Sequence, residues 1–247
     1  MKNMIHFKKI RALFLILIFV LIGGVTVFAA NKYSGTPDKI PEEVNKVVNS
    51  NFEKIVSTMK KNLDQDTNQV HENTKFTLGN VYKLHHLRGD IYDTFKTLDK
   101  FNDYFAESNE WLYIVNYDGK SSFYIDVAMI EGKYELAYFG GDAGAFDNTL
   151  MKNNDRFSNN SILFASGNEY YFVNEDGNTL MVPNNMEDYI KNKSDYDTPM
   201  EGTKLRAVID NLLEKEIQRQ KNGEPFIYGS TSFLKMYKEM YGEKVFK

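Results

Sequence analysis

Apolar residues recur at three- and four-residue steps in the segment that follows Pro41, and this spacing predicts an amphipathic helix that ends near Leu63. Proline suits the first position of a helix, and Glu42 and Glu43 place negative charge where the helix dipole favours it. The apolar positions are Val44, Val47, Val48, Phe52, Ile55, Val56, Met59 and Leu63. They form one stripe, so one face of this helix is expected to be buried.

The next part of the chain alternates between runs of β-branched or aromatic residues and short polar turns, which predicts β-strands. Asp118-Gly119 and Glu131-Gly132 are two-residue turn signals, and turns this short join antiparallel strands. The predicted strands are Thr74–Leu87 (interrupted near Gly79-Asn80), Trp111–Tyr117, Ser122–Ile130 and Tyr134–Phe139. Between the first two, Asp90–Phe105 has helical spacing and is expected to form a second helix or an irregular crossover.

Residues 140–160, rich in Gly, Asn and Asp, form a predicted break with one helical turn around Leu150. Three more short strands are predicted after it, at Ile162–Ala165, Glu169–Val173 and Thr179–Val182. Thr203–Lys221 then carries a helical apolar stripe, and Ser230 is a candidate cap for a last helix that runs to about Tyr241. This order predicts an α+β fold, in which amphipathic helices pack on one or more antiparallel β-meander sheets.

The first 30 residues have the pattern of an export segment. Basic residues precede the uncharged stretch Ala12–Asn31, whose first half (LFLILIFVLI) is densely apolar, and short residues stand before a possible cleavage site after Ala29. Basic, apolar and then small is the order of a secretory signal peptide. Residues 12–30 are also long enough to cross a bilayer, so an uncleaved single transmembrane anchor is the alternative. Both interpretations predict that the rest of the chain is extracytoplasmic, either secreted or anchored in the cytoplasmic membrane with the C-terminus outside.

The predicted domain organisation follows these patterns. Residues 1–30 are the signal peptide or anchor, and 31–38 (NKYSGTPD) form a polar linker. Residues 39–141 form a helix with an antiparallel sheet. Residues 142–247 carry the second meander and the C-terminal helices, either as a second domain or as part of the same globular unit.

Charge and composition narrow the classes of function. Of the 30 basic residues, four lie in the first 30 positions, which hold no acidic residue; the other 26 stand against 34 acids, so residues 31–247 carry a net charge of −8. This balance argues against nucleic-acid binding. Cysteine is absent, which excludes disulfides, thiol catalysis and thiolate metal sites. The amino-acid composition, rich in Lys, Asn, Ile and Tyr, is typical of a bacterium with an A·T-rich genome.

No metal, cofactor or catalytic residue is predicted. The run that starts at Asp64 begins like a calcium loop, but Gln69 and Lys75 occupy the positions where that loop needs Gly and Glu. Ser57 and Ser232 each precede a lysine at S-x-x-K spacing, yet no companion motif of that hydrolase chemistry accompanies them.

The amphipathic helix, TLGNVYKLHHL (77–87) and WLYIVNYDGKSSFYIDVAMIEGKYELAYFGG (111–141) together resemble the helix-plus-curved-sheet domains of secreted Gram-positive proteins. Such domains are similar to PepSY and cystatin-like modules. The resemblance covers about residues 40–141. It implies an inhibitory, chaperoning or accessory role in the cell envelope, and it assigns no functional residue.

Aromatic residues make up 14% of the chain and concentrate in the predicted strands. Most rings in a half-buried sheet belong to the core, and any that remain exposed on one face form a recognition surface for a peptide or glycan. The candidates for such a ligand surface are Trp111, Tyr113, Tyr117, Tyr124, Tyr170 and Tyr171.

The sequence therefore predicts an exported bacterial envelope protein that acts as a non-enzymatic binding or accessory module for a protein, peptide or glycan. One alternative is an envelope hydrolase with dispersed carboxylates, which two close acids with a raised pKa in a cleft would favour. Another is a structural or developmental coat component. The expected partner is an envelope protein or peptide, with membrane contact through residues 12–30 if the segment is not cleaved.

Overall fold

A computed structural model describes residues 39–67, 75–153, 157, 161–166, 169–183, 185–224 and 239–242. They lie within one compact unit, Asn31–Lys247, and the fold is α+β, as predicted. The export segment lies outside the described residues. Within the described part of the chain, no helix is both long enough and apolar enough to span a membrane.

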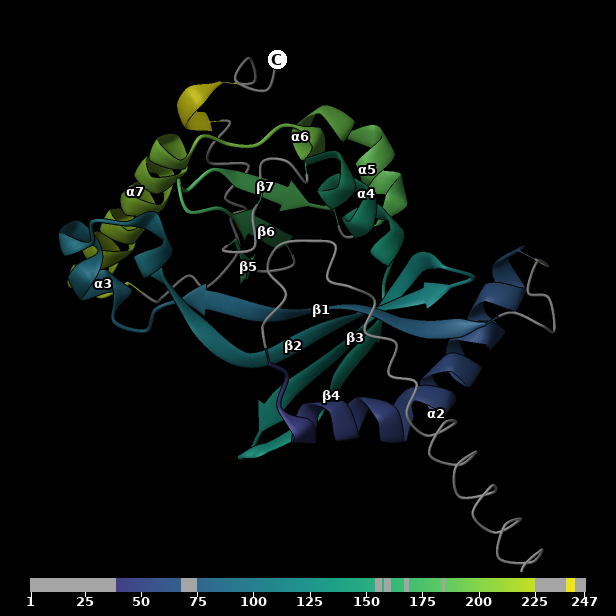
Figure 1. Cartoon of the computed structure of the whole chain (residues 1–247). Coiled ribbons are helices and arrows are strands. Elements are labelled where there is room, and N and C mark those ends of the chain that lie inside the picture. The colour runs from purple at the N-terminus through teal and green to yellow at the C-terminus, as the bar shows by residue number, and fades with distance from the viewer. Residues whose placement is uncertain are drawn as a thin grey trace, which may run out of the picture. The chain divides into compact units, whose positions relative to one another are not determined.

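Seven strands form a single sheet in the order β4-β3-β2-β1-β5-β6-β7 (Figure 1). The strands are β1 (Phe76–Leu87), β2 (Phe105–Tyr117), β3 (Lys120–Ile130), β4 (Lys133–Gly140), β5 (Ile162–Ser166), β6 (Glu169–Val173) and β7 (Thr179–Val182). The α-helices are α2 (Glu42–Thr67), α3 (Ile91–Thr94), α4 (Ala143–Asn153), α5 (Met186–Lys191), α6 (Lys193–Asp197) and α7 (Gly202–Lys221). Two 3-10 turns, η1 (Phe95–Thr97) and η2 (Phe101–Tyr104), lie between α3 and β2.

One strand pair departs from the predicted antiparallel sheet. β1 and β5 run parallel, with Leu84 opposite Leu163 and His85 opposite Phe164, so the sheet is mixed. All the other pairs are antiparallel. A parallel pair needs a long connection rather than a turn, and here that connection contains β2, β3, β4 and α4. No local turn signal marks such a pair, which explains why the sequence did not predict it.

Helix α2 covers one face of the β2–β4 part of the sheet. Its apolar stripe, including Val44, Val48 and Ile55, packs against side chains that alternate along β2 and β3. Those side chains are Trp111, Tyr113, Val115, Phe123, Ile125 and Val127. The Tyr113 hydroxyl donates a hydrogen bond to Asn45 Oδ1 at 3.0 Å, which satisfies the polar end of a buried ring.

Helix α4 packs on the opposite face. The alternate residues of β2, Leu112 and Ile114, point to this side and meet Phe146 and Leu150 of α4. The apolar residues of β5–β7 that join the same cluster are Leu163, Phe172, Leu180 and Val182. Both faces of β2 are therefore buried, which accounts for its continuous apolar run WLYIV.

Helix α7 and the segment that precedes β2 cover the remaining face of β5–β7. Leu205, Val208, Ile209 and Leu213 of α7 form one cluster with residues of this segment and of the three strands. The Tyr104 hydroxyl donates to Asp210 Oδ1 at 2.8 Å, and Arg206 Nη1 donates to the carbonyl of Asp99 at 2.9 Å. These two hydrogen bonds fix α7 to the segment that contains α3, η1 and η2.

The helical elements differ from the prediction in three places. Asp90–Phe105 forms a four-residue helix and two 3-10 turns rather than one helix, because Leu98 adopts an extended conformation (ψ 127°) between them. The predicted single turn around Leu150 is the 11-residue helix α4. Helices α5 and α6 were not predicted; Asn185 caps α5, with its Oδ1 accepting from the Asp188 amide at 2.8 Å. Most of the predicted last helix lies outside the described residues.

Gly202 begins α7 where the helix touches the turn between β6 and β7. A Cβ at this position would lie 2.5 Å from the carbonyl oxygen of Asp176, which is backbone and cannot swing away. We therefore expect Gly202→Ala to lower the free energy of unfolding by about 2 kcal/mol or more, although alanine is the better helix former. Urea unfolding measures the change.

Gly89→Ala is the matched control, because a Cβ at Gly89 would meet nothing within 4 Å. Equal stabilities of the two variants would show that the contact between α7 and the turn is loose.

Candidate functional site

Five polar or aromatic residues gather on the sheet face that α4 covers, at the place where that face opens to solvent. We call them the acid–tyrosine cluster; they are His86 of β1, Glu110 of β2, Asp126 of β3, Tyr138 of β4 and Tyr170 of β6. Asp126 lies opposite both Leu112 and Tyr138 in the sheet register. Exposure rises towards the β4 edge: Tyr138 is 55% exposed and Ile130 is 42% exposed.

The centre of the cluster is a pair of carboxyl groups. Asp126 is only 8% exposed, and its Oδ1 is buried without a hydrogen-bond partner among the described residues. The Glu110 side chain is 27% exposed and lies 3.1 Å from His86 Nε2 through its Oε2. The pair thus joins a buried acid to a carboxylate that solvent and an accessible histidine reach.

The two carboxyl groups differ in protonation. Burial, together with the charge of Glu110 and a hydrogen bond to it, raises the pKa of Asp126 to about 8. The hydrogen bond from His86, and then the one from Asp126, lower the pKa of Glu110. At neutral pH the pair therefore shares one proton and one negative charge, and the directions of the two pKa shifts favour the proton on Asp126 and the charge on Glu110.

Tyr170 completes the cluster from the far half of the sheet. Burial raises the pKa of its hydroxyl to about 12, and the nearby charges of Asp126 and Glu110 act in the same direction. Its ring centroid lies 6.4 Å from that of Tyr124, whose hydroxyl donates to the carbonyl of Asp142 at 3.0 Å. The hydroxyl of Tyr170 thus stays neutral over the pH range in which the acid pair titrates.

The structure places most of the predicted aromatic surface inside the protein. Trp111, Tyr113, Tyr124 and Tyr171 are each at most 5% exposed and belong to the hydrophobic core. These four rings therefore do not form an exposed surface in this structure. Helices cover both faces of the strands that carry them, so rings that point to either face are buried.

The other two predicted residues are half-buried and lie apart. Tyr117 packs against Phe76, with ring centroids 5.0 Å apart, next to the β2–β3 turn. Tyr170 lies in the acid–tyrosine cluster, and the buried ring of Tyr124 lies next to it. Of the six candidates, the structure thus brings only Tyr124 and Tyr170 to the candidate site.

The charged members of the cluster were missed by the sequence reading. One signal was present: Asp126 interrupts the apolar run FYIDVAMI of β3, at a position whose neighbours Ile125 and Val127 are buried. A lone acid inside such a run is costly unless it is paired. Nothing local indicated its partner, because Glu110 reaches Asp126 only through the pairing of β2 with β3.

The two histidines of β1, His85 and His86, lie in different surroundings. His85 Nδ1 lies 3.2 Å from the carbonyl oxygen of Lys83 and 3.3 Å from that of Leu163, and burial lowers its pKa. His86 faces Glu110 instead. No group of three His, Asp or Glu side chains suited to a metal ion occurs among the described residues.

No family model matches this chain, and no curated protein matches it.

The pH dependence of stability tests the acid pair. The pKa of Asp126 is about 8 in the folded protein and 3.8 as its ordinary value, so the folded state keeps a proton that the unfolded chain loses. The stability that this proton contributes is complete below about pH 4, declines as the pH rises and is gone above about pH 8. In Asp126→Asn the amide keeps a donor towards Glu110 at every pH. Relative to wild type, we expect this variant to gain up to about 1.4 kcal/mol per pH unit between pH 5 and pH 8.

Urea unfolding at one-unit intervals from pH 5 to pH 9 gives this difference. Glu135→Gln removes an exposed carboxylate from the same sheet and is expected to follow the wild-type curve. Parallel curves for wild type and Asp126→Asn would show that Asp126 is ionised throughout the range.

Proposed function

We propose that this chain is an extracytoplasmic envelope protein of a bacterium, secreted or held in the membrane by residues 12–30, that binds a partner without chemical turnover. The export segment supports this location. Digestion by protease added to intact cells tests it. The resemblance of residues 40–141 to PepSY and cystatin-like domains suggests an accessory or inhibitory role of the same kind.

The proposed binding site is the acid–tyrosine cluster, and its ligand is a lysine or arginine side chain of a protein or peptide partner. The observation that carries the proposal is the ionised, accessible carboxylate of Glu110, on the same open sheet face as the exposed ring of Tyr138. A carboxylate gives a cation a charge-assisted hydrogen bond, and a tyrosine ring attracts it through its π face. Behind Glu110, the buried Oδ1 of Asp126 has no hydrogen-bond partner among the described residues.

Removal of the accessible charge tests this site. We expect Glu110→Gln to weaken binding of an acetylated oligo-lysine peptide by about 10-fold or more, because a hydrogen bond to a charged group contributes about 1.5–3 kcal/mol. Isothermal titration calorimetry at constant ionic strength, with the full chain in lipid nanodiscs, measures the affinity.

Glu53→Gln is the matched control. It removes the same charge from an exposed position of α2, which packs on the opposite face of the sheet. Equal losses in the two variants would mean that the peptide senses only the net charge of the protein, and the proposed site would then be wrong.

A second candidate function is supported by the same two acids. A protonated Asp126 beside an ionised Glu110 is the division of labour that an acid–base hydrolase uses. For this function we expect the purified protein to cleave a wall glycan or peptide and Asp126→Asn to abolish that cleavage. Binding of the cationic peptide without any turnover would favour the first proposal.

A further inference from the structure

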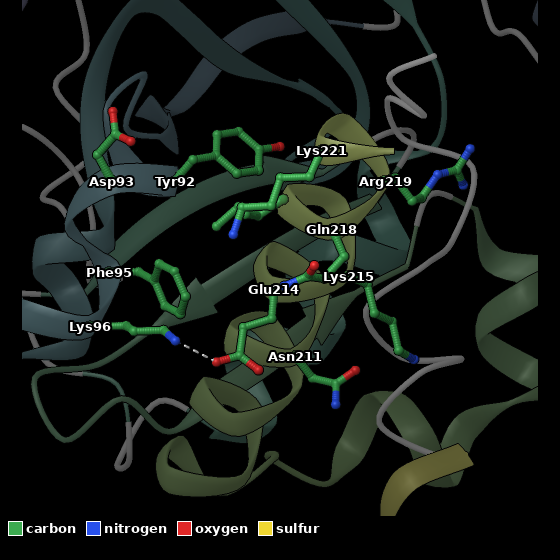
Figure 2. A pocket seen from close by; sticks show the side chains of 11 residues that line it. Tyr92, Asp93, Phe95, Lys96, Asn211, Glu214, Lys215, Gln218, Arg219 and Lys221 are labelled. Carbon is green, nitrogen blue, oxygen red and sulfur yellow. Dashed lines mark ion pairs between the residues drawn. The ribbon is translucent and has the colours of Figure 1, made fainter. Parts of the chain in front are cut away.

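A cavity of about 830 Å³ lies between the segment that contains α3 and η1 and the C-terminal half of α7 (Figure 2). Its volume falls within the range of small-molecule sites. None of its lining residues belongs to the acid–tyrosine cluster, so it is a separate feature of the molecule.

Three of the residues that line the cavity are apolar or aromatic, and the other eight are polar or charged. Phe95 lines it from η1 and is 3% exposed, and the half-buried Tyr92 and Ile217 extend the apolar surface on the two sides. Lys96 and Glu214 form an ion pair of 2.9 Å that links the two walls at one end. Since Glu214 is paired in this way, it adds little net negative charge to the cavity.

The charged residues that line the cavity are net positive, since Lys96, Lys215, Arg219 and Lys221 stand against Asp93 and Glu214. Figure 2 shows the side chain of Lys221 extending from the last turn of α7 towards Tyr92 and Phe95, whereas Lys215 and Arg219 point to the other side of the helix and Asp93 points away from α7. Lys221 forms no ion pair with any described residue, while Arg219 Nε lies 3.2 Å from Glu224. A cation in the last turn of a helix is also favoured by the helix dipole. The dipole does not explain why the Lys221 side chain extends towards the aromatic residues of the α3 segment.

We propose that this cavity binds a small organic anion, whose carboxylate meets the Lys221 ammonium while its apolar body lies on the half-buried Tyr92 and Ile217, above the buried ring of Phe95. The charge of Lys221 fits an anion, and the aromatic wall fits a ring or short alkyl chain. This activity goes beyond the proposed partner binding, because it uses other elements, the opposite charge and a ligand of another size.

Three probes of matched shape test the proposal: 4-phenylbutyrate, the neutral 4-phenylbutanol and the cationic 4-phenylbutylamine. Isothermal titration calorimetry uses the full chain in lipid nanodiscs, with empty nanodiscs as the blank. We expect the anion to bind at least about 10-fold more tightly than the other two probes. Lys221→Gln should remove this preference, whereas Lys221→Arg should retain it.

Lys120→Gln is the matched control, since it removes the same charge from an exposed position of β3 that does not line the cavity. It should change the affinity for the anion less than twofold. Fluorescence of Trp111, which lies in the core against α2, verifies that each variant is folded. Equal affinity for the three probes, equal losses in the Lys221→Gln and Lys120→Gln variants, or no binding of the anion at millimolar concentration would each overturn the proposal.

Discussion

The parallel pairing of β1 with β5 is the contact on which the rest of the structure depends. β1 stands at the centre of the strand order, with three strands on each side of it. Its pairing with β5 has two registered positions, Leu84 with Leu163 and His85 with Phe164. Parallel pairs are slightly less stable per residue than antiparallel ones, so a join this short relies on the packing around it. Leu84 and Leu163 lie in one buried cluster, and His85 approaches the Leu163 carbonyl on the same join.

This join also creates the candidate site. Glu110 and Asp126 belong to the first set of strands, whereas Tyr170 belongs to β6 in the second set. Tyr82 of β1 and Phe172 of β6, with ring centroids 5.5 Å apart, carry the aromatic core across the join. The site is thus a product of tertiary structure, and a change that weakens the join would separate its acids from Tyr170.

The sequence predicted the features that short-range physics specifies. At the two hairpin turns the backbone adopts positive φ, with Asp118 at 46° and Gly119 at 78°, as the Asp-Gly signal requires. The apolar stripes of α2 and α7 likewise follow from spacing alone. The parallel pair and the partner of Asp126 depend on register between distant strands, which no local pattern encodes. Which of the aromatic candidates are covered likewise depends on the helices that pack on each face of the sheet.

The acid pair has a cost that the fold alone does not explain. A buried acid beside a carboxylate contributes less to stability than two apolar residues of similar size would, and its orphan Oδ1 adds to the cost. The proposed cationic ligand would account for the presence of the acid pair, because a cation bound at Glu110 can replace the proton that the two acids share. Binding would then release that proton and strengthen as the pH rises towards 8, while the free protein loses stability over the same range. A single proton on Asp126 therefore links folding and binding with opposite signs, which a pair retained only for packing would not do.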